Sequence, residues 1–311
     1  MVHGSFWKHH PIADQTGVDL AAATLDFQRK TKSAFAKVTP AGNYQIADRG
    51  GIAEWCGDSL GRRTFETRAI QCVDDWLQVL EYPHQLTAIE TEMVRAADIT
   101  VQSLRCSNVP VYATLFLPLS QMFMLAGADR LVEDLFSSPE PLRRVADRLA
   151  TDTERLIKAY LNAGVDGFFI ASQHCSDLIV PQAFYQQFGV EFDARILEAC
   201  IVATEKPILH LHGERVYFDL LNGVSEKLIV HYELNNSNKS LTEFLASYSQ
   251  VIAPSLPVSG WQQRDLQGLR ELQKICGARA AFYSAPCVVP LSISDNEVAD
   301  WVEWCNREVD Q

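Results

Sequence analysis

The feature that most constrains the fold is a repeated alternation of short apolar runs with longer amphipathic segments. Uninterrupted apolar strands separated by helices are typical of a parallel sheet covered on both faces. The pattern predicts strands at about residues 4–7, 35–38, 111–117, 167–171, 207–211, 227–231, 250–253 and 280–284. It predicts helices between them at about residues 19–30, 86–105, 139–163, 181–200, 215–222, 239–247, 264–276 and 294–307.

About eight such units in 311 residues predict one α/β domain over 1–311, folded as a closed (β/α)8 barrel. An open, doubly wound sheet is the alternative, but no GxGxxG motif follows any expected strand. Residues 43–71 interrupt the alternation. They contain Gly50-Gly51 and Gly57, which favour an excursion of turns or a hairpin.

Composition narrows the class of protein. Lys and Arg total 27 against 39 Asp and Glu, and this acidic balance disfavours nucleic-acid binding. No segment has the ~20 apolar residues of a membrane span, and the first residues lack the apolar run of a signal peptide. The eight cysteines form no CxxC pair, so we expect a cytoplasmic protein with reduced, mostly buried thiols.

Six of the eight histidines fall at or just after the carboxyl end of an expected strand. They are His9, His10, His174, His210, His212 and His231. In a parallel barrel these strand ends meet on the face that carries the active site. A single strand-end histidine can equally well hydrogen-bond to loop backbone, but the set favours a functional pocket.

The most informative stretch is Leu209-His210-Leu211-His212-Gly213-Glu214. Side chains alternate along a strand, so His210 and His212 share a face and can bind one metal ion, or an oxyanion without metal. Cys287 follows the last expected strand and reaches the same mouth. Two imidazoles, a thiolate and one open position are typical of catalytic zinc, whereas a buried, inert Cys287 is the alternative.

Further polar residues surround this group. His174 is a candidate acid or base, with His9, His10 and Glu214 as further catalytic candidates. Cys175 is either a fourth soft ligand or simply buried. The remaining candidates are residues suited to holding a polar substrate, namely Trp7, Lys8, Lys37, Tyr44, His231, Glu233 and Asn235.

Several motifs together resemble the uroporphyrinogen decarboxylase superfamily over nearly the whole chain. They are Ser5-Phe6-Trp7-Lys8-His9-His10-Pro11, Phe27-Gln28-Arg29, Lys37-Val38-Thr39-Pro40-Ala41, Gln173-His174, His210-Leu211-His212-Gly213-Glu214 and Pro286-Cys287-Val288-Val289-Pro290. The resemblance implies a (β/α)8 barrel and a homodimer.

Two branches of the superfamily differ from this chain in informative ways. True uroporphyrinogen decarboxylases carry arginines after the first strand and an essential aspartate after the second. This chain has Lys8-His9-His10 and Thr39-Pro40-Ala41 there. Corrinoid-linked methyltransferases bind zinc through His-x-Cys-Gly and a later cysteine. His210, His212 and Cys287 match those places, with His212 where that branch has cysteine.

Three functions follow as hypotheses. The first is zinc-dependent transfer of a methyl or alkyl group to a small polar substrate, with a separate corrinoid protein or folate as the methyl carrier. The second is a metal-free decarboxylase or lyase acting on a small carboxylic acid or a porphyrinogen. The third is a non-catalytic barrel that binds a ligand, because the fold alone decides no function.

Overall fold

The computed structural model describes residues 3–234, 237 and 239–309. The apolar runs form a parallel barrel whose strands, in order around it, are β2 (Ala36–Val38), β5 (Val111–Phe116), β6 (Gly167–Ser172), β7 (Ile208–Leu211), β8 (Ile229–Tyr232), β9 (Val251–Ile252), β10 (Phe282–Tyr283) and β1 (His3–Gly4). Single parallel bridges link β9 to the β10 region. At the junction of β1 and β2, the amide of Phe6 donates to Ser33 Oγ at 3.3 Å. The (β/α)8 barrel predicted from the alternation is confirmed, although no strand pairing among the described residues joins β1 to β2.

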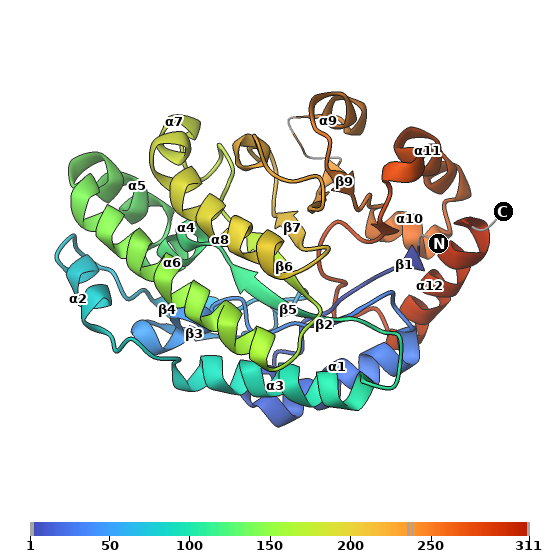
Figure 1. Cartoon of the computed structure of the whole chain (residues 1–311), viewed down its shortest axis with the longest axis horizontal. Helices are drawn as coiled ribbons and strands as arrows, with labels where there is room; N and C mark the ends of the chain where they lie inside the picture. The colour runs from blue at the N-terminus through green and yellow to red at the C-terminus, as the bar shows by residue number, and fades with distance from the viewer. Residues whose placement is uncertain (1–2, 235–236, 238, 310–311) are drawn as a thin grey trace.

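Helices lie outside the strands (Figure 1). The main ones are α1 (Gly17–Thr31), α3 (Ala88–Leu104), α4 (Pro118–Ala126), α5 (Ala128–Ser137), α6 (Pro139–Asn162), α8 (Val190–Ala203), α11 (Leu266–Cys276) and α12 (Asp295–Val309). The shorter ones are α2 (Asp75–Glu81), α7 (Gln182–Phe184), α9 (Leu241–Ser247) and α10 (Val258–Gln263). The last helix joins the first strand, because the amide of Gly4 donates to Asn306 Oδ1 at 3.0 Å. None of the described helices is long and apolar enough to cross a membrane.

The two faces of each strand bury different residues. Leu209 and Val230 point outward and pack in the large core between sheet and helices. Phe169, Ile208 and Ile229 point inward and form a separate cluster that fills the barrel. His210 lies on the inward face of β7, two residues after Ile208, as the period of a strand requires.

Residues 43–71 contain the expected hairpin. Its strands β3 (Ile52–Glu54) and β4 (Thr64–Thr67) pair antiparallel. The hairpin and the segment after it bring three arginines to the cavity at the barrel mouth, namely Arg62, Arg63 and Arg68.

The structure corrects two expected helices. Residues 215–222 hold only a single 3-10 turn (Asp219–Leu221), because the consecutive bulky residues Val216, Tyr217 and Phe218 are all buried. Residues 181–200 split into α7, a π-helical turn (Tyr185–Gly189) and α8. A Cβ at Gly189 would lie 2.6 Å from the Tyr185 ring, so this wide turn depends on glycine.

Helices α4 and α5 occupy residues for which the periodicity predicts no helix. In α4, eight of nine residues are buried, including Ser120 and Gln121. A helix buried on all sides has no apolar stripe for a periodicity analysis to detect.

The thiols are divided between core and surface. Four of the eight free cysteines are buried: Cys175, Cys200, Cys276 and Cys305. Cys56, Cys72 and Cys106 are exposed, and Cys287 is half-buried. The expectation of mostly buried thiols therefore holds for only half of them.

Asp193 joins α8 to the start of α4. Its carboxyl group accepts hydrogen bonds from the amide of Leu119 at 3.2 Å and the hydroxyl of Tyr185 at 3.3 Å. Burial raises the pKa of Asp193 to about 7. Between about pH 4 and pH 7 the Asp193 carboxyl group is protonated in the folded chain but ionised in the unfolded chain. The free energy of unfolding therefore falls as the pH rises across that window.

Substituting Asp193→Asn removes this titration. Between pH 5 and 8 we expect the free energy of unfolding of the wild type to fall by about 2 kcal/mol relative to the variant. Urea unfolding at the two pH values measures the difference, with Asp129→Asn, an exposed carboxyl on α5, as the control. Parallel pH profiles for wild type and Asp193→Asn would contradict the assignment.

Candidate active site

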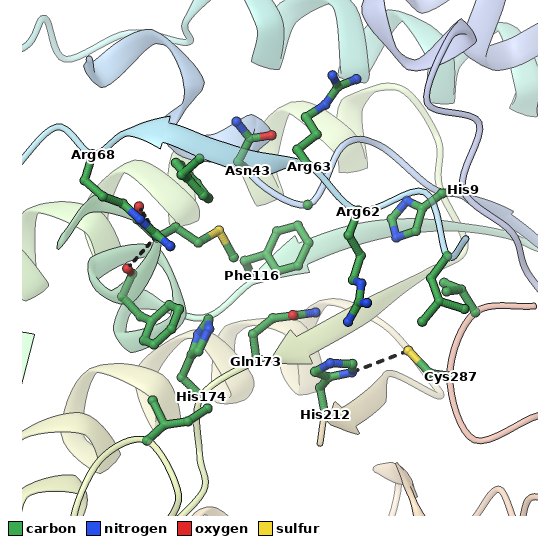
Figure 2. A pocket seen from close by; sticks show the side chains of 17 residues that line it. His9, Asn43, Arg62, Arg63, Arg68, Phe116, Gln173, His174, His212 and Cys287 are labelled. Atoms are coloured by element: carbon green, nitrogen blue, oxygen red, sulfur yellow. Dashed lines mark hydrogen bonds between the residues drawn. The ribbon is translucent and has the colours of Figure 1, made fainter. Parts of the chain in front are cut away.

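A cavity of about 340 Å³ opens at the carboxyl ends of the strands, and the β3–β4 segment forms one of its walls (Figure 2). His212 and Cys287 lie together at one end, with Arg62 directed toward them. Arg68 lies at the other end, beside His174. The volume lies within the range of small-molecule sites, ~300–1,000 Å³.

His210, His212 and Cys287 form a compact group of donor atoms. Cys287 Sγ lies 3.6 Å from His210 Nε2 and 3.4 Å from His212 Nδ1. All three donor atoms lie within 4.8 Å of one another. Gly213 follows His212 with a φ of +92°, a left-handed conformation that glycine adopts without strain. The sequence predicts that these two histidines and the cysteine lie together, and their side chains are adjacent in space.

A chain of hydrogen bonds fixes the orientation of the His210 ring. Strands β7 and β8 pair with His210 opposite His231, and the two Nδ1 atoms lie 2.7 Å apart. His231 Nε2 lies 3.0 Å from the carbonyl oxygen of Ala285, which can only accept. We assign the proton of His231 to Nε2, so its Nδ1 accepts from His210 Nδ1–H. This assignment leaves the lone pair of His210 Nε2 directed to Cys287.

Burial and neighbouring charges set the ionisation of this group. Burial, followed by the neighbouring histidines, holds the pKa of His210 well below its usual value, so its ring is neutral. Burial alone would raise the pKa of Cys287, but His212, followed by the Val288 amide and Lys37, outweighs it and the pKa is lowered. Burial lowers the pKa of Lys37 to about 7. Its Nζ lies in the barrel interior, 3.1 Å from Thr39 Oγ1 and 4.4 Å from the centroid of the Phe169 ring.

This donor set fits a zinc ion. Zinc binds thiolate sulfur at ~2.3 Å and imidazole nitrogen at ~2.0 Å, so tetrahedral ligands lie ~3.5 Å apart. The two sulfur–nitrogen separations of 3.6 and 3.4 Å match that value. The lowered pKa of Cys287 and the neutral ring of His210 favour the ligating forms. The backing of a ligand histidine by a second polar group is also typical of metal sites.

Two further predicted residues line the same cavity, His9 and His174. Burial, followed by the charge of Lys37, lowers the pKa of His9 to about 3. Burial holds the pKa of His174 well below its usual value. The His174 ring stacks on Phe123 with centroids 3.4 Å apart, and its Nδ1 is buried without a hydrogen-bond partner among the described residues. At neutral pH the His174 ring is therefore neutral and only weakly basic, and it offers hydrogen-bonding nitrogens to a ligand in the cavity.

Other predicted residues lie away from the cavity. Lys8 Nζ donates to the carbonyl oxygen of Ile293 and to Asp295 Oδ1 at 3.1 Å. The Tyr44 hydroxyl donates to the carbonyl oxygen of Thr114 at 2.6 Å and is buried.

The remaining predicted residues also lie outside the lining of the cavity. Trp7 packs in the barrel interior, with its ring centroid 5.2 Å from that of His231. His231 is fully buried and supports His210 from behind. His10 lines a separate hollow with Lys8, and Glu214 is exposed.

Cys175 lies apart from the His210, His212 and Cys287 group. It is buried, and its Sγ lies 3.4 Å from the carbonyl oxygen of Tyr217. Burial raises the pKa of this thiol, which disfavours a ligating thiolate. Asn235 lies outside the described residues.

Sequence reasoning missed the wall of the cavity that faces the strand ends. This wall contains Arg62, Arg63 and Arg68. They belong to the segment for which the sequence predicts only turns or a hairpin. The available signal was three arginines within seven residues of an acidic chain. Gln173, beside the predicted His174, also lines the cavity.

Comparisons with known proteins agree with this architecture. A methyltransferase from Methanosarcina mazei superposes with a TM-score of 0.78 at 12% identity, covering 98% of this chain and 94% of that one. A B12-independent methionine synthase from Shewanella sp. W3-18-1 gives 0.61 at 12% identity, covering 98% and 96%. At such identities the likeness shows the fold alone.

Sequence comparisons give a more specific assignment. No curated protein matches the chain. The family model described as uroporphyrinogen decarboxylase (URO-D) matches residues 64–229, which is more than half of the chain and includes His174 and His210. The chain belongs to the uroporphyrinogen decarboxylase family.

Proposed function

We propose that this protein is a zinc-dependent enzyme that transfers a methyl or alkyl group to a small polar substrate. The observation that carries the proposal is the grouping of His210 Nε2, His212 Nδ1 and Cys287 Sγ within 4.8 Å beside the cavity. The orientation of His210 by His231 supports it, since a histidine held in this way presents a lone pair at a fixed place.

Each residue of the site has a distinct proposed role. His210, His212 and Cys287 hold the ion, which lowers the pKa of a bound thiol or hydroxyl group and so supplies a nucleophile at neutral pH. Neutral His174 orients the substrate by hydrogen bonding within the cavity, because burial disfavours its protonation. The methyl donor is separate from this chain, either a corrinoid protein or a folate.

A second candidate is a metal-free decarboxylase acting on a small acid. The observation that favours it is the charge of the cavity, which three arginines line and no aspartate or glutamate does. Decarboxylation releases CO2 and leaves a carbanion that must take up a proton at carbon. His212 is the candidate proton donor. Burial lowers its pKa, but the charge of Cys287 raises it by a larger amount, so the net effect is an increase.

Metal content tests the ligand assignment. We expect purified, untagged protein to contain about one zinc ion per chain by plasma mass spectrometry. His210→Ala and Cys287→Ala should lose it, because a two-ligand set binds zinc weakly. The exposed His84 provides the control, and His84→Ala should retain the ion. Retention of zinc in both ligand variants would refute the assignment.

The role of His231 can be tested separately. His231→Phe keeps an aromatic ring but offers no acceptor to His210 Nδ1–H, so we expect zinc affinity to fall about 10- to 100-fold. His231→Gln offers an amide oxygen and should recover part of the loss. Competition with a chromophoric chelator measures the affinities. An unchanged affinity in His231→Phe would show that this contact only fills space.

Chelation separates the two candidate functions. Protein treated with a strong chelator should lose methyl transfer and regain it on addition of zinc. Release of CO2 from small carboxylic acids at equal rates before and after chelation would instead support the decarboxylase.

A further inference from the structure

The charge of the cavity opposes the charge of the whole chain. The sequence carries a formal net charge of −12. Yet three arginines line the cavity together with histidines, amides and apolar groups, and no carboxylate is among the lining residues. A positive cavity in an acidic protein concentrates anions.

Two of the three arginines are already neutralised. Arg62 donates through Nε and Nη2 to the carboxylate of Asp58, at 3.2 and 2.8 Å. Arg63 pairs through Nη2 with Asp14, whose side chain is fully buried. These arginines therefore have carboxylates of the chain itself beside them.

Arg68 has a different environment. Its Nη1 donates to the carbonyl oxygens of Phe123 and Met124, at 3.1 and 2.8 Å, which are close to the end of α4. Its guanidinium carbon lies 3.8 Å from the centroid of the Phe65 ring. Burial lowers its pKa and no neighbouring carboxylate offsets that effect. The guanidinium is thus held in place, yet it has no acidic partner among the described residues.

The unused donors of Arg68 form a defined edge. With Nη1 engaged, Nε–H and Nη2–H remain, and neither has a hydrogen-bond partner in the described part of the chain. These two groups lie on one side of the guanidinium and match the two oxygens of a carboxylate. Arg62 uses this edge for Asp58, and Arg195 uses it for Glu154 at 2.7 and 2.6 Å.

We propose that Arg68 binds a carboxylate group of the substrate through this edge. Figure 2 places Arg68 at the end of the cavity opposite His212 and Cys287. Phe116, Phe123 and Met124 contribute apolar surface to the lining. The substrate class is therefore a small aliphatic carboxylic acid, with its acid at Arg68 and its reacting group directed to Cys287. The placement of the reacting group near Cys287 rests on the proposed function. The carboxylate site at Arg68 does not.

Isothermal titration calorimetry on the full chain tests the site, with pentanoate, its neutral analogue pentanamide and inorganic phosphate as probes. We expect pentanoate to bind at least 10-fold more tightly than pentanamide. Arg68→Met should weaken pentanoate about 10- to 100-fold, which corresponds to losing two charged hydrogen bonds, and should leave pentanamide unchanged. Arg68→Lys keeps the charge without the paired edge and should give an intermediate loss.

Controls separate this site from the metal and from folding. Arg105→Met, at an exposed residue directly after α3, should bind pentanoate as the wild type does. Each titration is repeated after chelation, and thermal melting of each variant checks its fold. The inference would be overturned by any of three results. They are equal affinities for pentanoate and pentanamide, unchanged binding of pentanoate by Arg68→Met, and loss of pentanoate binding on chelation. Preference for phosphate over pentanoate would overturn the carboxylate assignment.

The outcome is independent of the zinc test. Binding of pentanoate through Arg68 in a protein that holds no zinc would preserve this inference and refute the proposed function. Zinc bound by His210, His212 and Cys287 without any Arg68-dependent binding of the acid would do the reverse.

Discussion

The candidate site depends on the pairing of two buried imidazoles across neighbouring strands. His210 and His231 are opposite one another in the parallel register of β7 and β8, and both are almost fully buried. Two rings that lie 2.7 Å apart away from water must share one proton between their facing nitrogens. The carbonyl oxygen of Ala285 can accept from the far nitrogen of His231, and Ser284 Oγ, 2.9 Å from the same nitrogen, donates to that carbonyl oxygen and can accept from His231 as well. Together these two contacts set the direction of the bond. A slip of one residue in this register would turn the pair to opposite faces.

The same barrel interior explains the charges around the site. Apolar rings fill the barrel below His210, and in this low-dielectric setting an unpaired charge is costly. Burial accordingly lowers the pKa of Lys37 and keeps His210 neutral. The pKa of Cys287 is lowered despite its burial, because the charge and hydrogen bond of His212, followed by the Val288 amide and Lys37, outweigh that burial. The site is thus a small set of mutually dependent ionisations.

The sequence predicts the barrel and the adjacency of His210, His212 and Cys287 for a common reason. Strand periodicity places His210 and His212 on one face, and convergence of strand ends brings Cys287 to them from 75 residues away in the chain. Periodicity fails where contacts are not repetitive. It does not show that Lys8 and Tyr44 turn to partners outside the cavity, at Asp295 and Thr114. Nor does it show that Arg68 lies at the cavity, because the path of an irregular segment depends on contacts between residues distant in the chain, such as the hydrogen bond from Arg68 to the carbonyl oxygen of Phe123.

The two ends of the cavity make related demands on a substrate. Two neutral imidazoles and one thiolate around a divalent ion leave one positive charge, so an anionic fourth ligand would neutralise the proposed site. At the other end, Arg68 carries a charge that no described residue balances. A neutral molecule would leave both charges uncompensated in a partly buried space, whereas an acid whose second group ionises on binding would compensate both. If both proposed sites are occupied in this way, the lining would discriminate against neutral analogues through the electrostatic cost of uncompensated charges as well as through the contacts it offers.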